Sequence, residues 1–350
     1  MPGATSFRQG LRRRQLLATA AALVPLHKAG AQGLLASDLL EAAKKEGKVV
    51  YYTTDDEPMA QVLVKGFQAA YPTITVELQR ANAAALLERL ESEQKAGPWQ
   101  ADVINTNDVR SLVLFRRNGW LAHYVPANVR QWPEAARDPA GFYAVQSLAV
   151  TVIGYNSRLV NPELAPKSYE DLLARRWHDK LVKLHPAESG IGLTTTFLMN
   201  RELGWSFWER LAQQGVLHVR SGVDAPAKLV GGERWAMVDG TEEAVLRLRA
   251  SGAPIMMVHA KEGSPVIPSG TSMFKEAPHP NAARLLVNWL MGRDAQQIVV
   301  NAGARSYHPD ARDTAERPPL ANLKLWQADP ILLAAESELI KQIYEQFFPN

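Results

Sequence analysis

The chain has 350 residues, with 39 lysines and arginines, 36 aspartates and glutamates, and no cysteine. This length allows a large buried core and, at roughly 100–200 residues per domain, two domains. Because cysteine is absent, disulfide bonds and lipid attachment at a cysteine are both excluded.

The N-terminal segment has the zones of an export signal in the right order. Residues 13–17 are Arg-Arg-Gln-Leu-Leu, which is typical of a twin-arginine signal, and an apolar run at 16–26 leads to small residues at 29–31. The apolar run is about eleven residues long, whereas a membrane-spanning helix needs about 20. We therefore predict that residues 1–31 are a twin-arginine signal peptide, removed on export to the periplasm.

Removal of the signal changes the charge balance. Residues 1–31 contain five basic residues and no acidic one, which leaves 34 basic against 36 acidic residues, a net charge of −2. Binding to nucleic acid or to a membrane surface needs a basic patch that persists in the folded protein. We therefore expect no nucleic-acid partner and no stable membrane insertion.

The N-terminal half of the mature chain alternates helix and strand patterns. Short apolar runs predict strands at 49–52, 74–78 and 102–104, and one-sided apolar patterns predict helices at about 38–46, 58–71 and 84–95. Repeated β-α-β order of this kind implies an α/β fold with mostly parallel sheets flanked by helices.

The same alternation returns in the second half. Strands are predicted at 181–184, 216–219 and 235–238, each followed by a helix that begins near 191, 225 and 242. We interpret two further strand-rich stretches, 142–155 and 254–258, as strands that cross between two lobes. Further helices are predicted near 283–290 and 331–347, and a surface loop at 305–322.

Motifs of catalysis and of metal or phosphate binding are missing from the sequence. It contains no G-x-S-x-G, G-x-x-x-x-G-K-[ST] or H-E-x-x-H pattern, and none of its eight histidines lies within four residues of another. We therefore expect no enzyme activity and no cofactor. A secreted α/β enzyme is a remote alternative, which incubation with candidate substrates would distinguish.

Four segments in the middle of the chain share one pattern. GYNSRLV at 154–160 is followed by PKSYEDLL at 166–173, RWHDKL at 176–181 and HPAESGIG at 185–192. In order and spacing this series resembles the family 1 extracellular solute-binding proteins of ABC importers, in the iron(III)-type branch of the type II periplasmic binding proteins. The resemblance implies two α/β lobes, joined by a two-strand hinge, that close over a small solute.

The resemblance also implies a partner and a division into lobes. The implied partner is an inner-membrane ABC permease. The alternative is that the protein is a receptor that feeds a sensor kinase. We expect lobe 1 to comprise residues 32–147 and 258–305, and lobe 2 to comprise residues 148–257 and 306–350. We expect a monomer.

Polar residues follow the predicted strands, at the edge where open α/β sheets bind ligands. The candidate ligand-binding residues in three of these loops are Thr53, Thr54, Asn105, Thr106, Asn107, Asp239 and Thr241. Such residues also suit helix caps, and both roles remain open because a helix N-terminus caps on the protein or binds an anion with the same geometry.

The strongest candidates follow the strand at 181–184. They are Ser189, Gly190, Thr194 and Thr195, in a segment where glycine lets backbone N–H groups approach an anion and hydroxyls add donors. The resemblance implies that the serine-glycine segment contacts the ligand, and Tyr155 joins the candidates as part of the family motif.

The sequence departs from the iron-binding members of the family. Those proteins carry adjacent tyrosines after the third cleft loop and often a histidine in the first, because Fe(III) prefers anionic oxygen donors. The matching segments here are Thr-Glu-Glu-Ala-Val-Leu at 241–246 and Thr-Thr-Asp-Asp at 53–56. We therefore predict that the solute is a small organic anion (a carboxylate, phosphonate or phosphate ester), with Fe(III) or a ferric chelate as the alternative.

Overall fold

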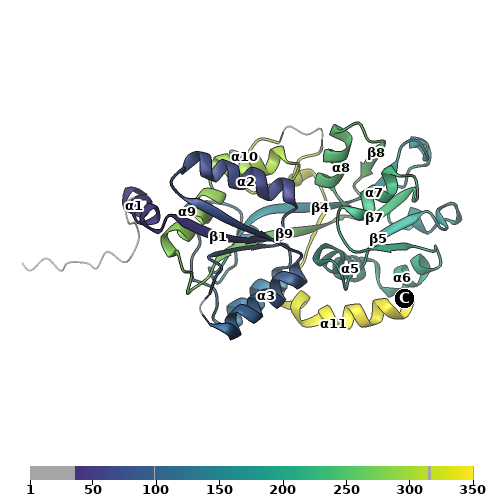
Figure 1. Cartoon of the computed structure of the whole chain (residues 1–350). Helices are drawn as coiled ribbons and strands as arrows, with labels where there is room; N and C mark the ends of the chain where they lie inside the picture. The colour runs from purple at the N-terminus through teal and green to yellow at the C-terminus, as the bar shows by residue number, and fades with distance from the viewer. Residues whose placement is uncertain (1–35, 98, 314–316, 350) are drawn as a thin grey trace, which may run out of the picture.

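The computed structural model describes residues 36–97, 99–313 and 317–349. The predicted signal peptide at 1–31 lies outside these residues. The described chain forms two α/β lobes side by side (Figure 1), and the α/β fold predicted from the strand and helix alternation is confirmed. No helix in these ranges has the length and apolar character needed to span a membrane.

The first lobe is built from the N-terminal β-α-β repeats. In chain order they are α1 (Ala36–Glu46), β1 (Lys48–Thr53), α2 (Glu57–Ala70), β2 (Thr75–Arg80), α3 (Ala83–Ala96), β3 (Val103–Thr106) and α4 (Val109–Arg117). Strand β1 pairs in parallel with β2 on one side and β3 on the other. Because these strands are parallel, their carboxyl ends meet at one edge of the sheet.

The second lobe repeats this plan. Its elements are β5 (Leu181–Leu184), α5 (Gly190–Leu203), α6 (Trp205–Ala212), β6 (Leu217–Val219), α7 (Asp224–Val230), β7 (Ala236–Thr241), α8 (Glu242–Ala250) and β8 (Ile255–Val258). Strand β5 pairs in parallel with β6 and β7. The carboxyl ends of these strands form the second edge that can face a ligand.

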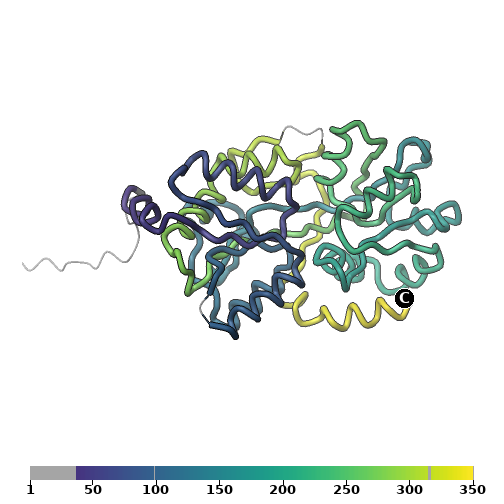
Figure 2. Tube along the Cα trace, viewed as in Figure 1, coloured from purple at the N-terminus to yellow at the C-terminus, as the bar shows by residue number. Residues whose placement is uncertain are grey.

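Two long strands connect the lobes. Strand β4 (Ala144–Asn156) pairs with β9 (Ser264–Met273) through its first half and with β7 and β8 through its second half. The last residues of β9 also pair with β3 of the first lobe, in antiparallel orientation. The tube view follows both strands through the middle of the molecule (Figure 2).

One of the two predicted crossing strands was wrong. The stretch 142–155 does contain β4, but 254–258 contains β8, which pairs only with the second-lobe half of β4. The second crossing strand is β9, whose prolines Pro265 and Pro268 hide it from strand patterns because proline is depleted in strands. The residue boundaries of the two lobes stay predictions.

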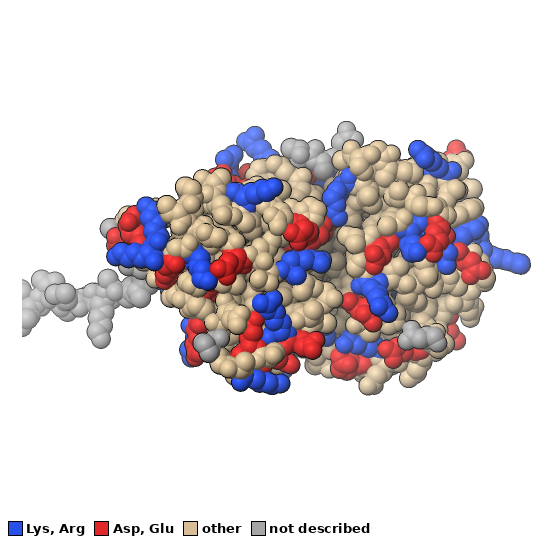
Figure 3. Space-filling model, viewed as in Figure 1, with Lys and Arg blue, Asp and Glu red and all other residues tan. Residues whose placement is uncertain are grey.

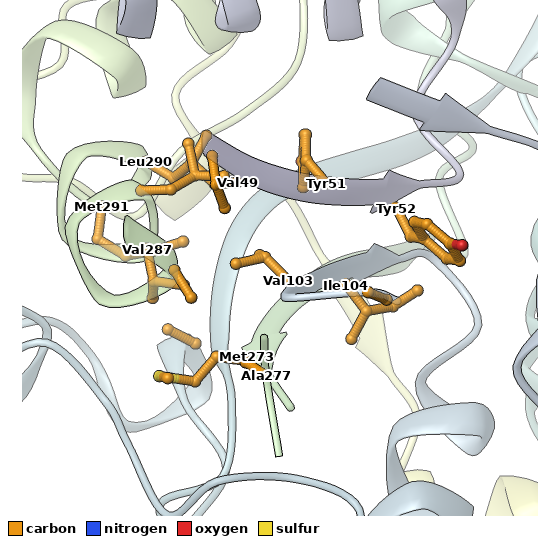
Figure 4. Packing of buried hydrophobic residues seen from close by; sticks show 14 of the residues in the cluster. Val49, Tyr51, Tyr52, Val103, Ile104, Met273, Ala277, Val287, Leu290 and Met291 are labelled. Atoms are coloured by element: carbon orange, nitrogen blue, oxygen red, sulfur yellow. The ribbon is translucent and has the colours of Figure 1, made fainter. Parts of the chain in front are cut away.

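The C-terminal part of the chain returns to both lobes. It comprises α9 (Pro280–Leu290), α10 (Arg293–Asn301), β10 (Leu325–Gln327) and α11 (Pro330–Phe347). Helix α9 covers the first sheet, where Val287 and Leu290 pack towards Val49 and Val103 (Figure 4). Helix α11 contacts α4 of the first lobe and α5 and α6 of the second. Short 3₁₀ helices lie at Ala127–Gln131, Glu134–Ala136, Pro162–Leu164, Glu170–Leu173, Arg175–Trp177 and Leu320–Asn322.

The predicted surface loop at 305–322 is partly buried instead. The side chains of Arg305 and Arg317 are 5% and 0% exposed, and both form ion pairs with the buried carboxylate of Glu242, at 2.7 and 3.1 Å. Burial alone would raise the pKa of Glu242, but hydrogen bonds from Arg305 and His259 and the charges of both arginines lower that pKa to about 2. The charge of these residues suggested exposure, because the sequence does not show that they are paired.

Candidate functional site

A cavity of about 480 Å³ lies between the lobes. Its walls come from the loops that follow β1, β2 and β3 of the first lobe and β5, β6 and β7 of the second, together with β4 and β9. These are the carboxyl ends of the parallel strands, the usual ligand position in open α/β sheets. Figure 3 shows the surface hollowed between the lobes, with acidic and basic side chains around the hollow.

Among the helices of both lobes that begin at this cavity, five have a side-chain cap. Their N-cap residues all line it, and each cap side chain accepts a hydrogen bond from a backbone N–H of the first turn; these residues are Asp56 of α2, Asn82 of α3, Asp108 of α4, Ser189 of α5 and Thr241 of α8. A helix N-terminus carries roughly half a positive charge. The carboxylates of Asp56 and Asp108 offset that charge at α2 and α4, and those of Glu242 and Glu243 in the first turn offset it at α8. The charge stays available at α3 and α5, which have neutral caps and no acidic residue in the first turn.

The N-terminus of α5 touches the first lobe. The Ser189 hydroxyl accepts a hydrogen bond from the N–H of Gly192 at 3.2 Å. A Cβ placed on Gly190 would lie 3.3 Å from Asn107 Oδ1, and the Asn107 N–H donates to Thr54 Oγ1 at 2.9 Å. The fold therefore brings Thr54, Asn107, Ser189 and Gly190 together across the two lobes.

The predicted site residues divide into two groups. Those that line the cavity are Thr54, Asn107, Ser189, Gly190 and Thr241. Those that do not line it are Thr53, Asn105, Thr106, Tyr155, Thr194, Thr195 and Asp239, all of them buried. Ligand contact by the first group stays a prediction.

Internal contacts account for several residues of the second group. Thr53 Oγ1 donates to Asn105 Oδ1 at 3.1 Å, and Thr106 Oγ1 accepts from the Asp108 N–H at 3.1 Å. Asp239 is fully buried against Lys183, with 2.9 Å between Oδ2 and Nζ. These side chains stabilise the sheets and loops beneath the cavity.

Acidic residues that were not among the candidates also line the cavity. Asp55 Oδ2 accepts a hydrogen bond from Gln146 Nε2 at 3.1 Å, and Asp56 pairs with Arg247 across the lobes at 2.5 Å. Burial and then the Asp56 charge raise the pKa of Asp55 to about 7. Burial and then the charges of Asp56 and Asp55 raise the pKa of Glu243, on α8, to about 7 as well.

Basic and hydroxyl side chains complete the lining. Arg80 is the last residue of β2 and donates from Nε to the Asp55 carbonyl at 3.1 Å, and Arg220 follows β6. Neither arginine forms an ion pair within the described ranges. Ser147 of β4 and Ser269 of β9 are opposite each other in the ladder and both line the cavity. The rule that selected the other loops, position at the carboxyl end of a strand, would also have found Arg80 and Arg220.

Within the described residues, no three His, Cys, Asp or Glu side chains form a group that could hold a metal ion.

A family model matches most of the chain. The sequence model described as bacterial extracellular solute-binding protein matches residues 100–328. An uncharacterized protein of Haemophilus influenzae is 25% identical over 292 residues, which cover 80% of this chain and 83% of that protein.

Solved structures share the fold. The periplasmic binding protein AfuA from Actinobacillus pleuropneumoniae, with fructose-6-phosphate bound, superposes with a TM-score of 0.76 at 20% identity and covers 86% of this chain and 98% of its own. Iron-bound HitA from Pseudomonas aeruginosa has a TM-score of 0.73 at 18% identity, covering 85% and 99%. At these identities the likeness establishes the fold, the two-lobed type II periplasmic binding fold.

Proposed function

Because the chain belongs to the bacterial extracellular solute-binding proteins, which are non-enzymatic and deliver small solutes to ABC importers, we propose that its solute is a small organic anion held in the cavity between the lobes. The anion is a carboxylate, a phosphonate or a phosphate ester. The protein acts in the periplasm after removal of residues 1–31.

The observation that carries this proposal is the convergence of helix N-termini on the cavity. Two of these helices, α3 with the cap Asn82 and α5 with the cap Ser189, have a neutral cap and no acidic residue in the first turn, so that their partial positive charges are not offset by their own side chains. An anion near a helix N-terminus gains roughly 0.3–1 kcal/mol per helix at an exposed site and more where water is excluded. Backbone N–H groups supply the hydrogen bonds.

Two arginines provide the counter-charge. Arg80 approaches from the first lobe and Arg220 from the second, and both line the cavity. An arginine binds two anionic oxygens with its planar donors, whereas the arginines already paired with carboxylates, such as Arg110 with Asp108 at 2.7 Å, are less available. An anion held by Arg80 and Arg220 together would connect the lobes.

Binding is coupled to lobe closure in this proposal. Residues from both lobes line the cavity, so a solute that contacts both favours the closed arrangement. Helix α11 packs on α4 of the first lobe and on α5 of the second. Its contacts therefore depend on closure of the lobes, and the permease can recognise the surface that results.

Calorimetric titration with a panel of carboxylates, phosphonates and phosphate esters tests the proposal. Ser189→Ala should weaken binding by ~1–3 kcal/mol, the range for a hydrogen bond to a charged group. Ser168→Ala is the control, because Ser168 is also a serine that accepts a backbone hydrogen bond, from Asp171 at 3.1 Å, but it does not line the cavity. Equal affinity in both variants, or no anion bound by the wild type, contradicts the proposal.

A further inference from the structure

The cavity has an acidic side that an anion alone does not explain. Asp55 and Asp56 reach it from the first lobe and Glu243 reaches it from the second. Arg247 pairs with Asp56 at 2.5 Å. Asp55 and Glu243 form no ion pair within the described residues.

Unpaired carboxylates in such a position oppose lobe closure. Bringing Asp55 and Glu243 together in a partly water-free cavity costs free energy, because each loses hydration and repels the other. Burial and then the Asp56 charge raise the pKa of both carboxyls to about 7, and the Asp55 charge adds to the rise at Glu243. A cation between the two carboxylates would remove this cost.

A hydroxyl on a largely buried side chain gives a second, independent sign of a ligand. Ser147 is only 9% exposed and lines the cavity. Its hydroxyl has no hydrogen-bond partner in the part of the chain that the structure describes. The oxygen is not among the fully buried atoms that lack a partner, so it is open to the cavity and available to a polar group there.

We propose that the solute carries an amino group in addition to its anionic group, with the amine between Asp55 and Glu243 and the anion at the helix N-termini around Ser189. This inference rests on the proposed function, since it assigns the second end of the same ligand. A cavity of about 480 Å³ has room for both ends of a small zwitterion.

The test uses pairs of compounds that differ by one amine. The pairs are β-alanine and propionate, 2-aminoethylphosphonate and ethylphosphonate, O-phosphoethanolamine and ethyl phosphate, and glucosamine 6-phosphate and glucose 6-phosphate. Ethanolamine serves as the amine without an anion. Calorimetric titration at pH 7.5 should show at least one amino compound that binds at least tenfold more tightly than its partner.

The variants separate the two ends of the ligand. Asp55→Asn with Glu243→Gln should weaken the amino compound at least tenfold and leave its amine-free partner unchanged or tighter. Asp294→Asn with Glu233→Gln is the charge-matched control, because both residues are exposed and lie outside the cavity. The thermal midpoint of the ligand-free Asp55 and Glu243 variant should not fall, which shows that it folds.

The outcomes distinguish this inference from the proposed function. If the amine-free anions bind as tightly as their amino partners, and Ser189→Ala weakens that binding, the inference is overturned and the proposed function stands. Ethanolamine that binds as tightly as the amino compounds, without dependence on Ser189, contradicts the proposed function. The absence of binding by every amino compound in the panel overturns the inference as well.

Discussion

Gly190 is the residue where the structure makes its sharpest prediction about lobe closure. It is the first residue of α5, and a Cβ placed there would lie 3.3 Å from Asn107 Oδ1 and 3.5 Å from Asp108 Cβ in the opposite lobe. Alanine needs a shift of only a few tenths of an ångström. Valine adds two methyl groups, each about 1.5 Å beyond Cβ, so Gly190→Val should hold the lobes apart.

The expected magnitude follows from overpacking. Extra methyl groups at a tight contact cost about 1–3 kcal/mol, which corresponds to about 5- to 150-fold in the dissociation constant. The clash arises only when the lobes meet, so the affinity for the best-binding anion should fall while urea unfolding of the ligand-free protein changes much less. Gly190→Ala should stay within about threefold of wild type, because its smaller clash is a fraction of that cost.

A matched substitution controls for the loss of glycine. Gly231→Val places its Cβ 3.4 Å from the carbonyl of Ala227, at a position outside the cavity. Calorimetric titration and urea unfolding of all three variants make the comparison. Wild-type affinity in Gly190→Val would refute the view that α5 must approach the β3–α4 loop when the solute binds.

Three further predictions concern charge, pH and export. The pKa values of Asp55 and Glu243 are raised in the folded protein, so that it binds more protons than the unfolded chain between about pH 4.5 and pH 7 and should lose stability as the pH rises through that window. The charged and titratable groups around these carboxyls are Asp56, Arg247, Arg317 and Tyr51. When the thermal midpoint is measured against pH, the double variant Asp55→Asn with Glu243→Gln should show a flatter profile than the wild type. An unchanged profile would contradict this assignment. Glu242→Gln should lower the free energy of unfolding by about 3–5 kcal/mol, because it leaves Arg305 and Arg317 buried without their counter-charge. A free energy from urea unfolding within about 1 kcal/mol of wild type, on the order of a surface substitution, would argue against this network. Replacement of Arg13 and Arg14 by lysine should retain the precursor in the cytoplasm in a fractionation experiment, and normal periplasmic accumulation would exclude the twin-arginine route.

The sequence predicted the lobes' repeats well because local patterns determine them. The runs around 49–52, 74–78 and 181–184 became β1, β2 and β5 with small shifts of boundary. Strand β9 was missed because Pro265 and Pro268 weaken its local strand pattern, while its pairing with β3 and β4 is long-range. A local pattern does not contain that pairing.

The candidate site was predictable at the level of loops but less so at the level of side chains. Thr53 and Thr54 are adjacent, and since successive side chains of a strand point in opposite directions, Thr54 lines the cavity while Thr53 is bonded to Asn105 beneath it. Asp55 and Glu243 are 188 positions apart in the chain, and only the facing of the two lobes makes them neighbours. The approach of these like charges across the cavity therefore required the structure.

The measurement that tests the central claim most directly is native mass spectrometry of the protein purified from its own periplasm, followed by identification of the small molecule released on unfolding. The account predicts a stoichiometric organic carboxylate, phosphonate or phosphate ester, and a complex whose abundance falls when Ser189 is replaced by alanine. A bound ferric ion or an uncharged solute in its place would contradict it.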